Sequence, residues 1–154
     1  MANKIDLNQL KKLREETSAS ISDCRMALDE SHGDYAKAVA WLKKRGLEKA
    51  AKKSDRETSQ GMIHSYIHGG GRVGVLLELL CETDFVAKTD EFVSLAREIE
   101  MQIAAMNPET VSELLKQEYI RDNSQTIEQL VKSVIGKLGE NITIGRFQRF
   151  AIGM

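Results

Sequence analysis

Apolar residues in the first 46 positions recur at helical spacing, and polar residues separate the apolar runs. An N-cap at Asp6 is expected to open a first helix and an N-cap at Asp34 a third, because these side chains satisfy free N–H groups of a first turn. The second helix is expected to begin near Ser20. Gly46 is expected to end the third, since glycine readily adopts the left-handed conformation found after helix C-termini. Residues 1–46 are therefore predicted to form a small three-helix domain.

The next segment, residues 47–60 (LEKAAKKSDRETSQ), is polar and basic. Good helix formers occupy its start and turn-forming residues its end, so it is predicted to be a basic helical linker that passes into a loop. Its lysines and arginines could contact RNA, but Glu48 and Asp55 interrupt them, and no aromatic side chain accompanies them to stack on bases. A solvated linker is favoured, and direct binding of nucleic acid is not expected.

The remaining residues, 61–154, contain three strand patterns. Two strand-like runs, GMIHSYIH and VGVLLELLC, are joined by glycine-rich residues, which is a hairpin signal. The second run is apolar on both faces and is predicted to be a central strand covered on both sides. The later segment NITIGRFQRF alternates and then changes phase at Gly145, which predicts a third strand with a bulge.

Helical spacing also occurs between these strands. A long helix is expected to start at Thr89 or Asp90 and to end before Asn107-Pro108, with an apolar face made by Phe92, Ala96, Ile99, Ile103 and Met106. Another is expected from Thr126 to Gly139, with Gln129 completing a capping box. The fold class is therefore α+β: a small N-terminal three-helix domain followed by a core of a three-stranded antiparallel sheet packed with helices.

The composition permits this architecture and limits the cellular compartments in which the protein is expected. The chain of 154 residues is 42% hydrophobic and has a net charge of −1, so a buried core is feasible and a general nucleic-acid binder is disfavoured. No apolar run approaches the ~20 residues of a membrane span, and the start, MANKIDLNQL, lacks an apolar signal region. A cytoplasmic protein is expected, with a plastid stroma as the alternative.

The sequence contains few motifs that could bind phosphate or metal or carry out catalysis. The glycine run HGGGRVG precedes a strand and lacks the Lys-Ser/Thr of a P-loop, so a hairpin turn is favoured over a phosphate site. In a strand, His64 and His68 lie about 13 Å apart, too far to share a metal ion. The sequence contains no nucleophile elbow and no zincin motif. We therefore expect a protein that is not an enzyme and that has no catalytic residues, no metal site and no cofactor.

The segment ETDFVAK raises a separate question. Only 5% of the residues are aromatic, yet Phe85 stands in the polar connection between the second strand and the long helix. A phenylalanine there is either the first core contact of the helix or a side chain offered to a partner, since buried aromatic residues dominate binding interfaces. From composition alone the core contact is favoured, and both readings stay open.

Several motifs, in order, resemble the elongation factor Ts family. The stretch LREETSASISDCRMALDESHGDYAKAVAWLKKRG is similar to that family's N-terminal, ubiquitin-associated-like domain, and KAAKK is similar to its linker. Thr83, Asp84, Phe85 and Val86, called here the TDFV turn, match the family's signature. The sequence GENI at residues 139–142 is similar to its C-terminal motif. The resemblance runs nearly from end to end.

This resemblance implies a guanine-nucleotide exchange factor for the GDP form of elongation factor Tu. In the family, the N-terminal domain and the core together bind the GTPase domain of the partner. The Asp-Phe pair enters that domain near its Mg²⁺ and phosphate site and helps to dislodge the Mg²⁺, after which GDP leaves. Carried over, Phe85 is the inserted side chain, Asp84 its polar companion, and Thr83 and Val86 shape the turn.

The chain also departs from the family pattern. The family usually has Gly-Ala-Gly-Met-Met where this chain has Ser18-Ala19-Ser20-Ile21-Ser22, so Ser20, Ile21 and Ser22 are the expected N-terminal partner contacts. Two arginines commonly follow the last motif, where Gly145-Arg146 stand here. The region after Asn107-Pro108 is short, and the chain has residues for one core lobe. Since shorter members pair two chains, we expect a homodimer formed through residues 61–154.

Two other functions remain open at this point. One is an RNA-binding translation accessory that uses the basic linker, for which tight binding that weakens steeply with salt would be the signature. The other is a ubiquitin-associated-type adaptor that binds helices and has no exchange activity.

Overall fold

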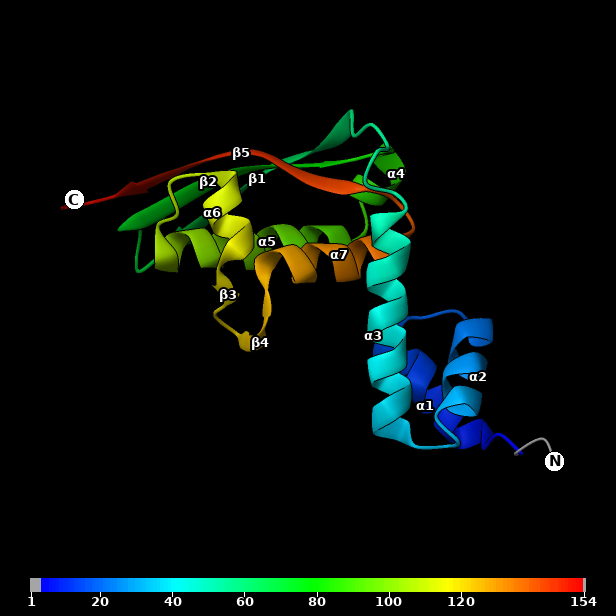
Figure 1. Cartoon of the computed structure of the whole chain (residues 1–154). Helices are drawn as coiled ribbons and strands as arrows, with labels where there is room; N and C mark the ends of the chain where they lie inside the picture. Colours follow the sequence, from blue (N-terminus) through cyan, green and yellow to red (C-terminus); the bar gives the residue numbers. More distant parts are fainter. Residues whose placement is uncertain (1–3, 154) are drawn as a thin grey trace.

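The computed structural model describes residues 4–153 (Figure 1). Its N-terminal part contains three helices, α1 (Leu7–Thr17), α2 (Ile21–Glu30) and α3 (Tyr35–Ala51). Each begins after a side chain that accepts a hydrogen bond from the first turn: Asp6, Ser20 and Asp34. The helices share a cluster of buried side chains, made by Leu13, Cys24, Ala27, Leu28, Ala38 and Leu42. The predicted three-helix unit is confirmed.

The predicted end of the third helix at Gly46 is wrong. Helix α3 passes through Gly46 and ends at Ala51. A Cβ on Gly136 of α7 (Ile127–Leu138) would lie 3.0 Å from the Cα of Gly46, so the two glycines mark a close approach of the helix backbones. Packing of α3 on α7 stabilises the helix beyond the glycine, and the predicted division at residue 46 falls inside one helix that reaches from the N-terminal helices to the core (Figure 1).

The three predicted strands form one antiparallel sheet. They are β1 (Gln60–His68), β2 (Val73–Cys81) and β5 (Ile142–Ala151), in the order β1-β2-β5. The glycine-rich turn closes the β1-β2 hairpin, and all three of its glycines have positive φ. The register shifts between Leu77↔Phe147 and Leu79↔Ile144, so Gly145 and Arg146 both lie opposite Glu78. The predicted bulge at Gly145 is confirmed.

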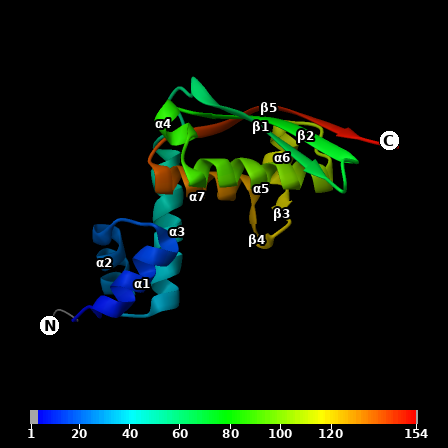
Figure 2. The same cartoon turned by 180° about the vertical axis from the view of Figure 1, so that it is seen from behind.

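Helices cover one face of this sheet (Figures 1 and 2). Helix α5 (Asp90–Met106) packs on β1 and β2, and α7 packs beside it. In the chain, α5 and α7 are separated by α6 (Val111–Lys116) and by a small hairpin of β3 (Glu118–Tyr119) and β4 (Asp122–Thr126). The hairpin was not predicted from the sequence. Gln102 of α5 is fully buried and bonds the backbone of Glu118 and Ile120, which fixes this polar hairpin on the core. Met106, expected on the buried face of α5, is half exposed because it is the last residue of the helix.

The prediction that β2 is covered on both sides is also wrong. β2 is the central strand, but Val75, Leu77 and Leu79 are buried under the helices while Leu76 between them is 51% exposed. The single helical layer leaves the opposite face of the sheet without cover. We call this side the open face; its exposed apolar residues are Ile63, Ile67, Leu76 and Phe150. Among the described residues, no helix is both long and apolar enough to cross a bilayer.

Candidate functional site

Phe85 lies on a one-turn helix, α4 (Asp84–Ala87), between β2 and α5. Its side chain is 78% exposed, the highest value among the large apolar residues that the structure describes. The first core contact of α5 is instead Phe92, which is fully buried. The structure therefore rules out the core contact: Phe85 is an exposed side chain held at the end of a buried strand.

Local sequence explains why Asp84 and Phe85 point outward. Thr83 is the N-cap of α4, and its hydroxyl accepts a hydrogen bond from the Val86 N–H at 3.4 Å. Ala87 is buried and Val86 packs against the main core, so the opposite side of this single turn faces solvent. Asp84 lies 3.6 Å from Lys88, and because both side chains are largely exposed this ion pair contributes little to stability.

The GENI segment, residues 139–142, also contacts the TDFV turn. Glu140 accepts two hydrogen bonds from Thr83, one from its N–H at 2.9 Å and one from its hydroxyl at 2.7 Å. Asn141 donates its N–H to Glu82 at 3.3 Å. Below the turn, burial raises the pKa of the Cys81 thiol, which donates to the Thr83 carbonyl at 3.0 Å. Glu140 and Asn141 belong to the GENI segment, for which no role was predicted.

The expected N-terminal contacts lie at the start of α2. Ser20 is the N-cap and accepts from the Asp23 N–H, so part of its role is to open the helix. Ile21 is 50% exposed and Ser22 is exposed, so both are available to a partner. Buried Asp23 pairs with Lys49 of α3 at 2.5 Å, and this hydrogen bond lowers the pKa of the Asp23 carboxyl. The pair fixes the start of α2 against α3.

The structure thus places the sequence-predicted contacts in two separate regions. Helix α4 lies beyond the C-terminal end of α3, whereas α2 lies alongside α3 (Figures 1 and 2). Because α3 packs on α7 through Gly46 and Gly136, both regions are attached to one continuous scaffold. A partner that contacts both would span the length of the C-terminal half of α3.

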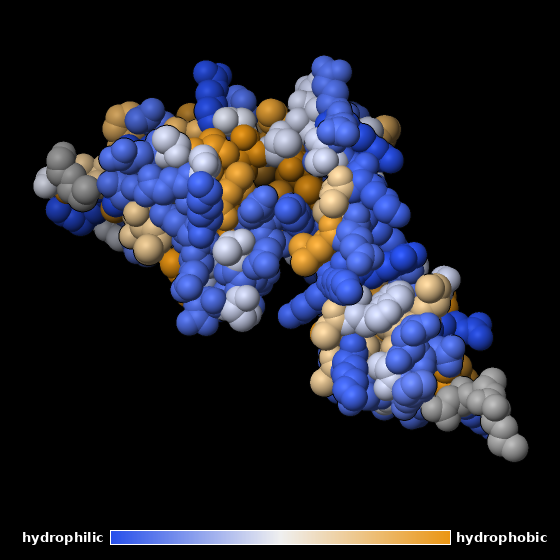
Figure 3. Space-filling model, in the orientation of Figure 1, coloured by the Kyte–Doolittle hydropathy of each residue, from blue (hydrophilic) through white to orange (hydrophobic). Residues whose placement is uncertain are grey.

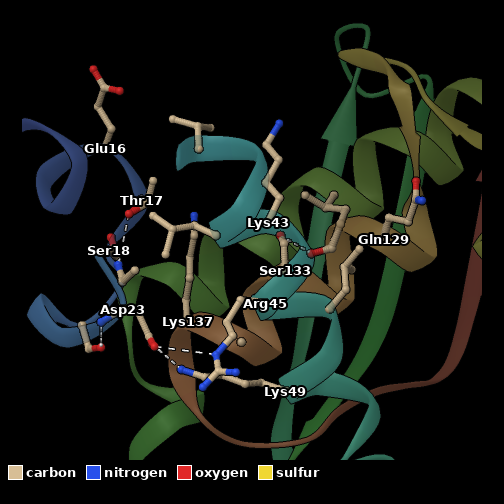
Figure 4. A pocket seen from close by; sticks show the side chains of 18 of the residues that line it. Glu16, Thr17, Ser18, Asp23, Lys43, Arg45, Lys49, Gln129, Ser133 and Lys137 are labelled. Carbon is tan, nitrogen blue, oxygen red and sulfur yellow. Dashed lines mark hydrogen bonds and ion pairs between the residues drawn. The ribbon is translucent and has the colours of Figure 1, made fainter. Parts of the chain in front are cut away.

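A cleft of about 990 Å³ is lined by residues of the N-terminal helices, of β4 and of α7 (Figure 4). Cationic side chains line it, but Arg45 and Lys49 of α3 are paired with Asp23 of the neighbouring helix α2. Figure 3 shows mostly hydrophilic surface around the N-terminal helices, whereas hydrophobic residues gather over the core. Within residues 4–153, no group of three or more His, Cys, Asp or Glu residues is arranged to hold a metal ion.

Comparison with known proteins identifies relatives over nearly the whole chain. The family described as Elongation factor TS matches residues 82–153, which include the TDFV turn and the GENI segment. A protein named Elongation factor Ts from Oleidesulfovibrio alaskensis is 43% identical, with 94% of this chain and 96% of the relative covered. One from Leptospira biflexa is 41% identical, with coverage of 97% and 98%. The alignments, of 189 and 194 residues, are longer than this chain of 154, so these relatives contain residues that have no counterpart here.

Proposed function

The chain belongs to the elongation factor Ts family, and we propose from this that it accelerates the release of GDP from elongation factor Tu during translation elongation. Membership of this family implies a nucleotide exchange factor that acts by binding and neither makes nor breaks a covalent bond. The observation that carries the proposal is the exposure of Phe85: its side chain is 78% exposed, it lies within the matched residues, and it is presented by a turn that Glu140 of the GENI segment holds.

In the proposed mechanism, Phe85 and Asp84 enter the GTPase domain near its Mg²⁺ and phosphate site. Mg²⁺ bridges the phosphates and neutralises their charge, so its displacement weakens the binding of GDP. Phe85 supplies apolar contact area and Asp84 a carboxylate that is only loosely paired in the free protein. Thr83 and Val86 hold the turn in shape, the first as its cap and the second through packing on the core.

Phe85 alone does not supply enough binding free energy to displace GDP from elongation factor Tu. Binding of the factor and binding of GDP weaken each other by the same ratio, and a thousandfold weakening of GDP binding requires about 4 kcal/mol of coupling. Full burial of one phenylalanine contributes roughly 1.5–3 kcal/mol. We therefore propose a second contact at the start of α2, through Ile21 and Ser22, with Ser20 capping the helix that presents them.

We further propose that residues 61–154 dimerise through the open face of the sheet. The exposed fractions of Ile63, Ile67, Leu76 and Phe150 range from 51% to 72%, and a contiguous exposed apolar patch typically marks an interaction site. Two such sheets pack face to face about 10 Å apart in β-sandwiches. A second copy of the chain would supply the layer that the open face lacks.

Replacing Leu76 by glutamate is expected to convert the dimer to a monomer. A carboxylate at the centre of the packed sheets would be buried without a partner, which costs several kcal/mol. Light scattering at about 10 μM should give twice the chain mass of 17.2 kDa for wild type and the single chain mass for the variant. Leu7→Glu is the matched control, because Leu7 is 76% exposed on α1 and should leave the dimer intact. A monomeric wild type at this concentration would contradict the proposed dimer.

The exchange function is tested by the release of fluorescent GDP from elongation factor Tu. We expect the wild-type chain at micromolar concentration to accelerate release by about a thousandfold, which corresponds to ~4 kcal/mol. No acceleration would exclude the exchange function. Binding to elongation factor Tu without acceleration would support the adaptor alternative, and tight, salt-sensitive RNA binding in its place would support the translation accessory.

A further inference from the structure

We propose that Glu140 is a positioning residue for nucleotide exchange, which fixes the direction of Asp84 and Phe85 through Thr83. Both carboxylate oxygens of Glu140 accept hydrogen bonds from this one residue, at 2.9 and 2.7 Å. Bonds to an ionised acceptor are stronger than neutral ones and, when they come as a pair, define an orientation. The inference rests on the proposed exchange function and assigns that function a residue outside the TDFV turn.

The TDFV turn needs such a support. Helix α4 has four residues, and a single helical turn is not stable by itself in water. Its internal cap, from the Val86 N–H to the Thr83 hydroxyl, is long at 3.4 Å, and Ala87 is the only residue of α4 that is buried. The hydrogen bonds from Glu140 are shorter than this cap, and they hold the residue that immediately precedes Asp84 and Phe85.

Glu140 is itself held from both sides. Before it, Gly139 ends α7 in the left-handed conformation at φ 76°, with its N–H bonded to the Ile135 carbonyl at 2.8 Å. After it, Ile142 is buried and pairs with Cys81 at the end of β2. The α7–β5 connection therefore places the carboxylate against the TDFV turn from a rigid base, while Glu140 itself is partly exposed.

The neighbouring residue links this support to the segment that follows α3. Asn141 is 4% exposed, and its amide donates to the Arg56 carbonyl at 2.8 Å, while its N–H donates to Glu82. Arg56 in turn lies 3.6 Å from Glu82. The segment after α3, the α7–β5 connection and the start of the TDFV turn thus meet in one hydrogen-bonded group, which keeps the turn in a fixed relation to the N-terminal contact region.

The test compares Glu140→Ala, Glu140→Gln, Phe85→Ala and the double variant Glu140→Ala/Phe85→Ala in fluorescent GDP release. Loss of the support should lower the release rate at saturating factor by about tenfold, which corresponds to ~1.4 kcal/mol, and should leave the half-saturating concentration within about twofold, since the contacts at α2 persist. Glu140→Gln retains one carbonyl acceptor for the Thr83 N–H and should restore the rate to within about threefold of wild type. Glu128→Ala, at an exposed glutamate of α7, is the matched control and should leave the rate unchanged.

The double variant decides between positioning and general stabilisation. If Glu140 acts through Asp84 and Phe85, Glu140→Ala should cause a smaller loss in a Phe85→Ala background, because only the positioning of Asp84 is left to lose. A full tenfold loss in that background would overturn the proposal. Should Glu140→Ala not fold, as judged by circular dichroism, the same pair of comparisons is made with Glu140→Gln, whose loss should likewise be smaller in the Phe85→Ala background.

A second measurement separates this proposal from the exchange function. Amide hydrogen exchange of the free protein should become faster in residues 83–86 for Glu140→Ala and stay unchanged for Glu128→Ala, whether or not elongation factor Tu responds. If amide hydrogen exchange becomes faster in Glu140→Ala but the wild-type chain does not accelerate GDP release, the nucleotide-exchange function is refuted. The support of the turn by Glu140 would remain valid. Unchanged amide exchange in Glu140→Ala would overturn the positioning role itself.

Discussion

Replacement of Phe85 by alanine is expected to lower the acceleration of GDP release by about 10- to 100-fold while the stability of the free protein stays unchanged. The side chain is 78% exposed, so its removal takes no contact from the core. In the complex it would be buried in the partner, where a phenylalanine contributes roughly 1.5–3 kcal/mol. Each 1.4 kcal/mol is tenfold in an equilibrium or rate ratio, which gives the expected range.

Stopped-flow release of fluorescent GDP from elongation factor Tu measures this effect directly, and thermal unfolding checks the fold. Ile120→Ala is a suitable control, because Ile120 is also an exposed apolar residue (45%) but lies at the β3-β4 hairpin, away from α4 (Figure 1). It should release GDP at the wild-type rate. Equal acceleration by wild type and Phe85→Ala would refute the insertion of Phe85 into the partner.

Features set by short-range rules could be predicted from the sequence. Thr126 and Gln129 form the predicted capping box of α7, and the glycine run forms the predicted hairpin turn. The bulge at Gly145 was visible as a change of phase, because alternation reports which face of a strand each side chain takes. These signals lie within a few residues of the structure they specify, so they can be recognised in the sequence alone.

Features set by distant contacts could not be predicted. Gly46 carries the local signal of a helix end, but its partner Gly136 lies 90 positions along the chain and turns the same residue into a packing contact. The alternation of burial in β2 was hidden, because Leu76 on the open face is as apolar as Leu77 beneath the helices. The exposure of Phe85 and the bonds from Glu140 to Thr83 likewise depend on segments that only the fold brings together.

The pair formed by partly exposed His64 and buried Glu100 is another such feature. His64 of β1 faces α5, where its Nδ1 lies 2.7 and 2.9 Å from the two carboxylate oxygens of Glu100, whose side chain is fully buried. Burial raises the pKa of Glu100, while the hydrogen bond to His64 and the charges of His64 and Arg97 oppose this rise. The histidine is thus the hydrogen-bonding partner that makes a carboxylate tolerable inside the core.

Removing this partner should destabilise the protein strongly and in a pH-dependent way. In His64→Ala, Glu100 either stays charged and unpaired, which costs about 3–5 kcal/mol, or holds a proton. When folding raises the pKa of a carboxyl, the protonated group stabilises the folded state. This stabilisation is fully present below the pKa of the unfolded chain, 4.5, and is lost as the pH rises through the pKa of the folded protein. The deficit relative to wild type should therefore grow from pH 5 to pH 7.5, as measured by urea unfolding at one protein concentration.

Two further variants identify the carboxylate as the cause. His64→Ala/Glu100→Gln replaces the buried charge with a neutral amide, so its deficit should be smaller than that of His64→Ala at pH 7.5 and constant over this range. His68→Ala is the matched control on the same strand, where the exposed histidine bonds the hydroxyl of Tyr66, and it should change stability by less than about 0.5 kcal/mol. A His64→Ala deficit of the same size at both pH values would show that lost packing, rather than the unpaired carboxyl of Glu100, is responsible, because packing does not titrate.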